Sequence, residues 1–272
     1  MRKLVHILVF CVLVISCIPA QPRKSIIIPE IHQHSESITE NESPTPPKAK
    51  ESQELLNSDT QSMIHYEGYC ISYNERMRIP NWVSYELTAK ETDGPYSRKG
   101  KNFRQDISLN MRQADSDDYR NSGWSRGHMA PAGDFKWSDE AMWDTFYYTN
   151  CCPQNQSLNA GQWNTLEQKV RDWARRFGKI YVVTGPIIGK NIYGTIGYNR
   201  VVVPDAFFKI VFAKDQAIAF IMYNHNNNEN MQKCAMSVDD LETLTGIDFF
   251  PELDDDFENQ VEATYNIRDW GL

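Results

Sequence analysis

The sequence lacks a hydrophobic run long enough for a comfortable membrane span. Its N-terminal apolar run, from Leu4 to Ile15, follows the basic residues Arg2 and Lys3. A spanning helix needs about 20 apolar residues, so this run is too short. A basic start followed by a short apolar run is typical of a secretory signal. We therefore expect residues 1–20 to be a signal peptide rather than a retained anchor.

Two ways of processing this signal stay open. Cleavage after Ala20 would release a secreted protein, although Ile18 and Pro19 make a poor small-x-small site. The stretch "LVISC" looks like a loose lipobox, in which Cys17 would carry the lipid. We expect an exported protein of a Gram-negative bacterium, either an outer-membrane or periplasmic lipoprotein or a secreted protein. Membrane contact would come only through the N-terminal lipid.

Residues 21–60 are nearly free of aromatic side chains and rich in Ser, Glu, Pro and Thr. Such a segment buries too little apolar surface to offset its ordering entropy, which predicts a disordered linker. His32 and His34 within it are better explained as solvated residues than as a metal site. The aromatic residues gather after it, and about 210 residues suffice for one domain, predicted at 61–272.

The predicted domain has few cysteines and none of the spacings typical of a zinc finger. They are Cys70, Cys151, Cys152 and Cys234, with no CxxC pair. We therefore expect no zinc site. An oxidising compartment would allow one or two disulfides, whose pairing stays open.

Positive charge is also scarce. The formal net charge of −8 argues against broad, passive binding of nucleic acid. The segments "YSRKGKNFR" and "KVRDWARRFGK" are nevertheless locally basic, so the charge balance does not exclude a phosphate substrate.

Alternating and periodic patterns predict an α+β domain built around an antiparallel sheet, with helices flanking it. Strands are expected at 66–74, 81–89, 179–188, 201–212 and 217–223, and helices at 138–150, 157–177 and 237–246. The stretch "CCPQNQSLN" between the first two helices is expected to be irregular. No internal repeat is visible.

The stretch "WSRGHMAPAGD", residues 124–134, resists assignment to a helix or a strand and concentrates polar residues. Histidine is the side chain best matched to proton transfer near neutral pH, and arginine can hold a phosphate. His128 and Arg126 therefore suggest a water activator beside a phosphodiester. On its own, His128 is more simply explained as a structural or surface residue.

The helix expected at 157–177 places Asn159 and Glu167 eight residues apart, rotated by only about 80° on an ideal helix. An amide oxygen and a carboxylate are hard ligands that suit Mg²⁺. Taken alone, Asn159 is as well explained as a cap-region residue and Glu167 as a solvated one.

The ordered set of motifs resembles the DNA/RNA non-specific endonucleases, a family of the ββα-metal or His-Me finger class. The resemblance rests on "SRGHMAP" followed by "TNCCPQNQSLNAGQWNTLE", at the family spacing. "YNERMRIPNWVSYELT", "VVTGP", "VPDAFFKIV" and "LTGIDFFPEL" also look like family segments in family order. The resemblance covers roughly residues 65–253.

The resemblance implies roles for five residues. His128 would be the general base, Asn159 the direct ligand of Mg²⁺, and Glu167 the holder of a metal-bound water. Arg126 would contact the phosphate, and Asn150 would support the histidine or its network. The implied activity is hydrolysis of DNA and RNA, with Mg²⁺ or a substitute such as Mn²⁺, to 5′-phosphate and 3′-hydroxyl products.

Two departures from the family pattern matter. Ser125 stands where the family motif opens with Asp, which removes a charge beside the expected metal site. A substrate-binding arginine expected before the motif has three candidates, Arg98, Lys101 and Arg104. Two other functions stay open: a catalytically weak surface lipoprotein that binds nucleic acid or a protein partner, and a phosphodiesterase for small nucleotides. A homodimer also stays open.

Overall fold

A seven-stranded sheet forms the centre of the computed structural model, which describes residues 61–226, 229–250 and 253–272. Its strand order is β1-β2-β3-β6-β9-β10-β11, and every neighbouring pair is antiparallel. The strands are Gln61–His65 (β1), Cys70–Asn74 (β2), Ile79–Thr88 (β3), Lys179–Ile187 (β6), Ala206–Ala213 (β9), Gln216–Tyr223 (β10) and Ala235–Met236 (β11). The predicted α+β class is confirmed. The signal peptide, the lipidated Cys17 and the linker predicted at 21–60 lie outside the described residues.

The strands expected at 66–74, 81–89, 201–212 and 217–223 are present with shifted boundaries, and they form two antiparallel pairs. β9 and β10 form a hairpin whose turn includes Lys214 at a φ of +58°. β2 pairs with β3, but Pro80 lies inside β3 opposite Tyr73, where the register shifts, instead of in the turn. β1 adds an unpredicted edge strand to β2.

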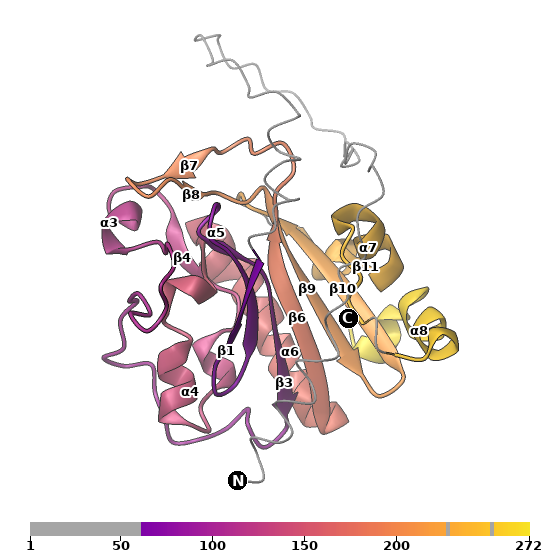
Figure 1. Cartoon of the computed structure of the whole chain (residues 1–272). Helices are drawn as coiled ribbons and strands as arrows, with labels where there is room; N and C mark the ends of the chain where they lie inside the picture. The colour runs from indigo at the N-terminus through magenta and orange to yellow at the C-terminus, as the bar shows by residue number, and fades with distance from the viewer. Residues whose placement is uncertain (1–60, 227–228, 251–252) are drawn as a thin grey trace.

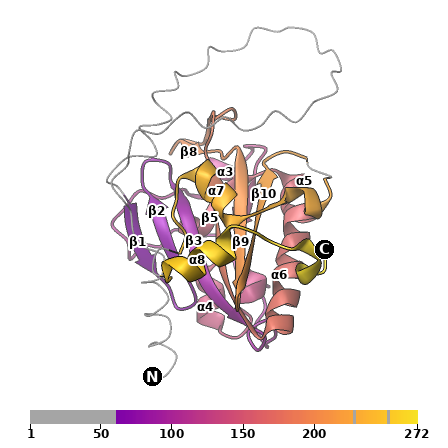
Figure 2. The same cartoon turned by 90° about the vertical axis from the view of Figure 1, so that its right-hand side faces the viewer.

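Helices cover both faces of the sheet (Figures 1 and 2). One face carries Ser116–Tyr119 (α3), Asp139–Asp144 (α4), Gln156–Leu158 (α5), the π-turn Asn159–Trp163 (η3) and Asn164–Phe177 (α6). The other carries Val238–Thr245 (α7) and Asp255–Glu262 (α8). Short 3₁₀ turns lie at Ala132–Asp134 (η1), Tyr148–Asn150 (η2), Met231–Cys234 (η4) and Ile267–Trp270 (η5), and a small hairpin pairs Thr195–Ile196 (β7) with Val201–Val202 (β8). Among the described residues, no helix combines the length and apolarity required to cross a membrane.

Capping residues set the ends of the helices as the sequence predicts. The Ser138 hydroxyl accepts the backbone N–H of Ala141 at the start of α4, and Ser237 does the same for Asp240 at the start of α7. α7 stops at Gly246, whose φ of +63° favours glycine. The helix predicted at 138–150 is shorter than expected, and α8 was not predicted.

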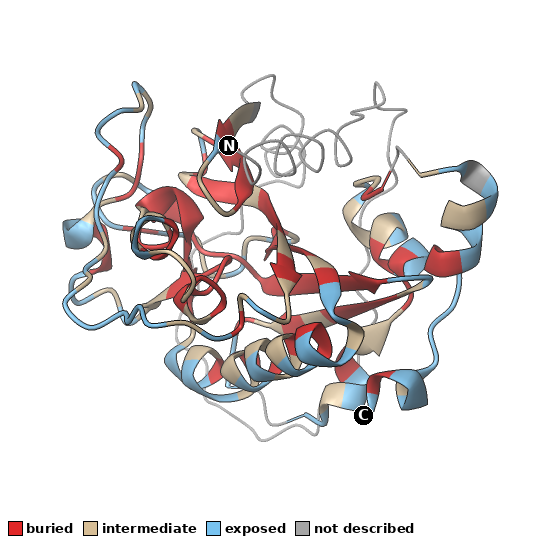
Figure 3. Ribbon diagram, turned by 90° about the horizontal axis from the view of Figure 1, so that it is seen from below, coloured by how far each residue is buried: buried red, intermediate tan, exposed pale blue. Residues whose placement is uncertain are grey.

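Two apolar cores lie on opposite faces of the sheet. The larger one receives one stripe of α6, formed by Leu166, Val170, Trp173 and Ala174. Burying a large apolar side chain of this kind contributes about 1.5–3 kcal/mol. The smaller core lies under α7 and α8 and includes Val238, Leu241 and Val261. Figure 3 shows this pattern, with buried residues concentrated in the strands and in the inward faces of the helices.

Three cysteines of the predicted domain are free thiols. Cys151, Cys152 and Cys234 are all buried. Burial raises the pKa of each thiol, so these side chains are poorly reactive. They pack as small apolar residues.

The C-terminal turn is anchored on α6 by aromatic contacts. The Trp270 ring is 1% exposed, and its centroid lies 5.1 Å from that of Trp173 and 5.5 Å from that of Phe177. The Trp173 indole also donates to the Trp270 carbonyl oxygen at 2.7 Å. The end of the chain is therefore part of the core.

Trp270→Ala is expected to lower the free energy of unfolding by about 3–5 kcal/mol, because it leaves a cavity beside α6. The midpoint of urea unfolding measures this loss if the slope stays unchanged. Trp270→Phe is the matched control: it keeps a ring and removes Nε1, which is buried without a hydrogen-bond partner among the described residues. A midpoint for Trp270→Ala equal to that of the wild type would contradict the anchoring role.

Candidate active site

His128 ends a short strand that the sequence did not predict. Ser125–His128 (β4) pairs antiparallel with Cys151–Gln154 (β5), which places His128 opposite Cys151. Both segments were expected to be irregular, and both expectations were wrong. The pairing requires a glycine before the histidine, because a Cβ at Gly127 would lie only 2.7 Å from the Cβ of Gln154. Gly127, which made the strand hard to recognise in the sequence, is therefore the residue whose small size permits it.

The His128 ring is enclosed by aromatic side chains. Its centroid lies 4.6 Å from that of Phe103 and 5.0 Å from that of Phe146, which it meets edge to face. Its Nε2 atom is buried and has no hydrogen-bond partner among the described residues. Burial first, and then the positive charge of Arg98, lower the pKa of His128 to about 3. The imidazole is therefore neutral near pH 7 and able to accept a proton.

Asn150 braces the chain that leaves His128. Its side-chain oxygen accepts the Ala130 N–H, and its amide donates to the carbonyl oxygens of Ala130 and Thr145, each at 2.9 Å. The side chain is fully buried. It ties two segments of backbone together beside His128, which matches a supporting role better than contact with a substrate.

The helix that carries Asn159 and Glu167 is not continuous. The π-turn η3 separates α5 from α6, and Gly161 within it has φ −102° and ψ −106°. The rotation of about 80° expected from an ideal helix therefore does not apply, because a π-turn inserts a residue into the helical repeat. Asn159 starts this turn, and Glu167 lies in the first turn of α6. Both side chains are half-buried.

Glu167 lies among charged groups from three parts of the fold. Burial raises the pKa of its carboxyl, whereas Lys209, Arg171 and Arg98 act in the opposite direction. Arg98 thus acts on both His128 and Glu167. The histidine and the carboxylate are thus both within the electrostatic reach of Arg98.

Lys209 is a buried charged residue near Glu167 that the sequence analysis did not single out. It is completely buried in the middle of β9, with Nζ 4.7 Å from the centre of the Trp163 ring and no hydrogen-bond partner among the described residues. Burial lowers the pKa of its ammonium group, and Glu167 opposes that change. A lone lysine within the apolar run "AFFKIVFA" was the available signal.

Asp134 and Arg171 form a second buried pair near Glu167. Arg171 donates to Asp134 at 2.7 Å, and the Tyr85 hydroxyl donates to the other carboxylate oxygen at 2.8 Å. Asp134 is fully buried in η1, and the Arg171 side chain is 14% exposed. The pair connects the turn after His128 to α6.

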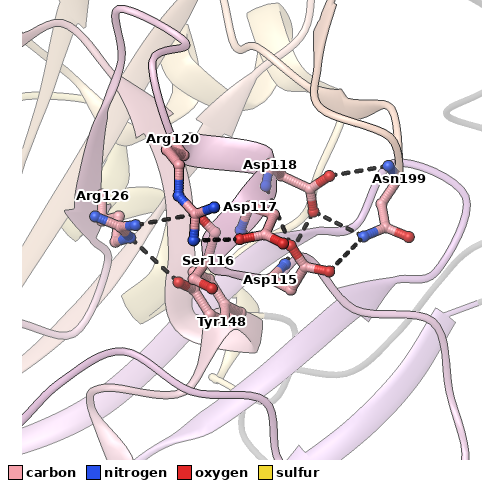
Figure 4. A network of polar contacts seen from close by, with 8 residues as sticks. All are labelled: Asp115, Ser116, Asp117, Asp118, Arg120, Arg126, Tyr148 and Asn199. Carbon is pink, nitrogen blue, oxygen red and sulfur yellow. Dashed lines mark hydrogen bonds and ion pairs between the residues drawn. The ribbon is translucent and has the colours of Figure 1, made fainter.

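Arg126 is half-buried at the edge of this site, on β4 (Figure 4). Its guanidinium donates to the Tyr148 hydroxyl at 3.2 Å and to the Ser116 carbonyl oxygen at 3.3 Å, and lies 5.3 Å from the centre of the Tyr119 ring. These contacts hold it against α3. Asp118 of that helix accepts both the backbone and the side-chain N–H of Asn199, which fixes the loop between β7 and β8 in place.

The structure separates the three candidates for the arginine before the motif. Arg98 is exposed, lies 5.7 Å from the centre of the Phe146 ring and lowers the pKa of His128. Lys101 instead pairs with Asp139 at 2.6 Å. Arg104 donates to the hydroxyl of Tyr147 at 3.2 Å. Of the three, Arg98 is the one whose charge lowers the pKa of His128.

Comparisons with known proteins agree with this arrangement. The family model for DNA/RNA non-specific endonucleases matches residues 48–256. Human mitochondrial endonuclease G is 33% identical over 204 residues, covering 69% of this chain and 69% of that protein. The chain belongs to the DNA/RNA non-specific endonuclease family.

Other relatives of this endonuclease-family chain point the same way. The mitochondrial nuclease EXOG of Xenopus laevis is 37% identical over 210 residues, covering 70% of this chain and 59% of that protein. The match thus spans less than two thirds of the length of this EXOG nuclease. A crystal structure of an EndoG/EndoGI complex matches with a TM-score of 0.67 and 28% identity, over 80% of this chain and 96% of that one.

The predicted location of this endonuclease-family chain is wrong. The matched relatives include mitochondrial nucleases of Xenopus laevis and of humans, which contradicts an exported lipoprotein of a Gram-negative bacterium. That prediction depended on a basic start and a short apolar run. This pattern describes a targeting segment by composition alone and does not identify the compartment it addresses.

Ser125 occupies the position at which the endonuclease family has an aspartate in its motif. Its hydroxyl donates to the side-chain oxygen of Gln156, at the start of α5. The serine thus connects β4 to the helix that leads to Asn159 by a hydrogen bond, without adding a negative charge.

The oxygen donors of this endonuclease-family chain fit a divalent cation such as Mg²⁺. Asn159 offers an amide oxygen and Glu167 a carboxylate, both hard ligands. Neither side chain forms a hydrogen bond to another described residue. A cation nearby would also favour the ionised form of Glu167, whose burial raises its pKa.

In the metal-free protein the His128 ring is expected to stay neutral from about pH 8 to about pH 5, since its pKa lies far below the ordinary value near 6.5. Ring nitrogen and carbon NMR shifts, assigned by their loss in His128→Gln, measure this. Arg98→Gln is expected to raise the pKa of His128, because it removes a positive charge that opposes protonation.

Arg175→Gln is the matched control, because Arg175 is exposed on α6 and pairs with Asp172 at 2.8 Å, away from His128. A titration midpoint near 6.5 in the wild type, or equal shifts in both arginine variants, would contradict this account of the histidine.

Proposed function

We propose that this chain is a metal-dependent endonuclease that hydrolyses phosphodiester bonds of DNA and RNA without reading their sequence. The observation that carries the proposal is the buried His128, whose Nε2 has no hydrogen-bond partner among the described residues and whose ring is kept neutral in part by the charge of Arg98. Arg126 lies two residues before His128 on β4. A neutral imidazole is a proton acceptor, and guanidinium groups bind phosphate. Membership in the endonuclease family supports the same assignment.

In the proposed reaction, His128 Nε2 takes a proton from a water molecule as that water attacks phosphorus. The bond from phosphorus to the 3′ oxygen breaks, and the departing oxygen takes a proton from a solvent water molecule while His128 later releases its proton to solvent, which leaves a 5′-phosphate and a 3′-hydroxyl. Arg126 binds a phosphate oxygen, and its bond to Tyr148 fixes the direction of its guanidinium. Arg98, which is exposed beside His128, binds the substrate backbone and keeps the histidine unprotonated.

Asn159 and Glu167 would hold the cation, Asn159 directly and Glu167 through a water molecule. When bound there, Mg²⁺ would supply positive charge that offsets the negative charge developing during the reaction. Lys209 and Arg171 have a supporting role, because both favour the ionised form of Glu167. Asn150 holds the backbone beside His128 through its three hydrogen bonds.

Lack of sequence preference follows from the groups involved. Contacts to phosphate carry no information about the bases, so a site that addresses only the backbone accepts many sequences. The same reasoning allows both DNA and RNA as substrates.

Purified protein is expected to cut plasmid DNA and RNA with Mg²⁺, to lose activity with EDTA, and to lose about 10²–10⁴-fold in kcat/KM on His128→Ala. Gel electrophoresis and 5′-end analysis of the products measure these effects. His225→Ala is the matched control, because His225 is exposed and stacks on Tyr223 away from the site.

Intact substrates with both Mg²⁺ and Mn²⁺ would overturn the proposal. Equal binding of nucleic acid without turnover by wild type and His128→Ala would favour a binding protein instead. Cleavage of a dinucleotide in preference to a polymer would favour a small-nucleotide phosphodiesterase.

Ser125→Asp is expected to lower the Mg²⁺ concentration needed for half-maximal activity, because a carboxylate adds negative charge near the proposed metal site. Ser125→Asn is the control, since it has nearly the same size and no charge. The Mg²⁺ dependence of initial rates measures the effect. Identical dependence in the two variants would show that charge at this position is unimportant.

A further inference from the structure

We propose that Asp239, Glu242 and Glu262 form a second cation site, which binds Ca²⁺ and joins α8 to α7. It lies on the sheet face opposite the candidate active site, where α7 and α8 run close together (Figures 1 and 2). This site is independent of the proposed nuclease reaction.

The three carboxylates converge from two helices. Asp239 and Glu242 are three residues apart on α7, so they share one side of that helix. Glu262 is the last residue of α8. One carboxylate oxygen from each residue lies within 4.8 Å of the other two. This separation suits oxygen atoms that share one cation.

Glu262 provides the observation that points to a ligand. Its side chain is only 3% exposed, and its Oε1 atom is buried without a hydrogen-bond partner among the described residues. Glu242, in contrast, accepts the Phe249 N–H at 2.8 Å. Among the described residues, no ion pair involves any of the three carboxylates. A buried carboxylate near two others is costly unless a positive charge is added.

The ligand set favours Ca²⁺ over other common cations. Carboxylate oxygens alone select hard cations over zinc or copper. Ca²⁺ accepts six to eight oxygens in a flexible arrangement, including bidentate carboxylates, whereas Mg²⁺ requires near-ideal octahedral geometry. Asp239 is exposed, so water can complete the coordination from that side.

A bound cation would strengthen the packing of the last helix. α8 contributes Val261 and Phe257 to the smaller core, and the Phe257 ring lies 6.4 Å from that of Phe212 on β9. Without a cation, the cluster avoids repulsion by taking up protons, because burial and then the neighbouring acids raise the pKa of Glu262 to about 9. With Ca²⁺ bound, the ionised carboxylates of both helices would share one cation, which would hold the helices together.

Thermal unfolding of the EDTA-treated full chain, with and without Ca²⁺, tests the proposal. We expect Ca²⁺ at about 100 times its Kd to raise the Tm by about 5–10 °C in the wild type. In Glu262→Gln, the unfolding temperature without Ca²⁺ should equal or exceed that of the wild type, because the amide has the same size and removes one buried acid from the cluster. In this variant, the rise in Tm on addition of Ca²⁺ should disappear, apart from any part of it that comes from Ca²⁺ bound at the active site.

Asp240→Asn is the matched control, since Asp240 is an exposed acid beside Asp239 on α7 but outside the cluster. It should keep the wild-type response. Calorimetric titration should show one fewer Ca²⁺ bound by Glu262→Gln than by the wild type or Asp240→Asn. An equal response and stoichiometry in Glu262→Gln and the wild type, or no response in the wild type, would overturn the proposal. Either result would leave the proposed nuclease function unaffected.

Discussion

A cluster of four ionisable side chains between α6 and the sheet, two fully buried and two half-buried, is the constraint on which the active-site face depends. Asp134, Glu167, Arg171 and Lys209 come from η1, α6 and β9, and together they carry two acids and two bases. Their mutual attraction offsets a desolvation cost of several kcal/mol per ion only while all four are present. Loss of one base would leave a buried carboxylate without compensation. The positions of α6 and β9 are therefore fixed by charge as well as by apolar packing.

These charges affect the proposed chemistry through the protonation state of Glu167. A carboxylate buried without positive neighbours would take up a proton and become a poor cation ligand. Lys209 and Arg171 act against that, and Arg98 adds a third positive charge while keeping His128 unprotonated. Positive charge thus favours the ionised form of Glu167 and the neutral form of His128. Both forms are those that a hydrolytic site needs.

Sequence patterns predicted the parts of this protein that depend on local periodicity. The β9–β10 hairpin, β6 and the capped helix α7 were found because alternation and caps are local signals. β4 and β5 were missed because their pairing depends on Gly127 fitting against Gln154, a contact between distant segments. The π-turn was missed because Gly161 changes the helical phase without changing the apolar stripe. The spacing of the motifs placed His128 and Glu167 in one predicted site. Lys209 was not predicted, because its effect on Glu167 depends on how β9 and α6 come together in the fold.

Net charge was a poor guide to the proposed substrate because it does not describe how charge is distributed locally. Four acids, Asp254, Asp256, Glu258 and Glu262, lie in or next to α8, on the sheet face opposite α6. Arg98, Arg126 and Lys209 are on the opposite side, within or beside the proposed site. Solvated charges act over about a Debye length, roughly 10 Å in ordinary buffer, so a polyanion approaching the His128 face meets mainly the local cations. A chain with a formal charge of −8 can therefore still present a phosphate-binding surface where exposed cations such as Arg98 are concentrated.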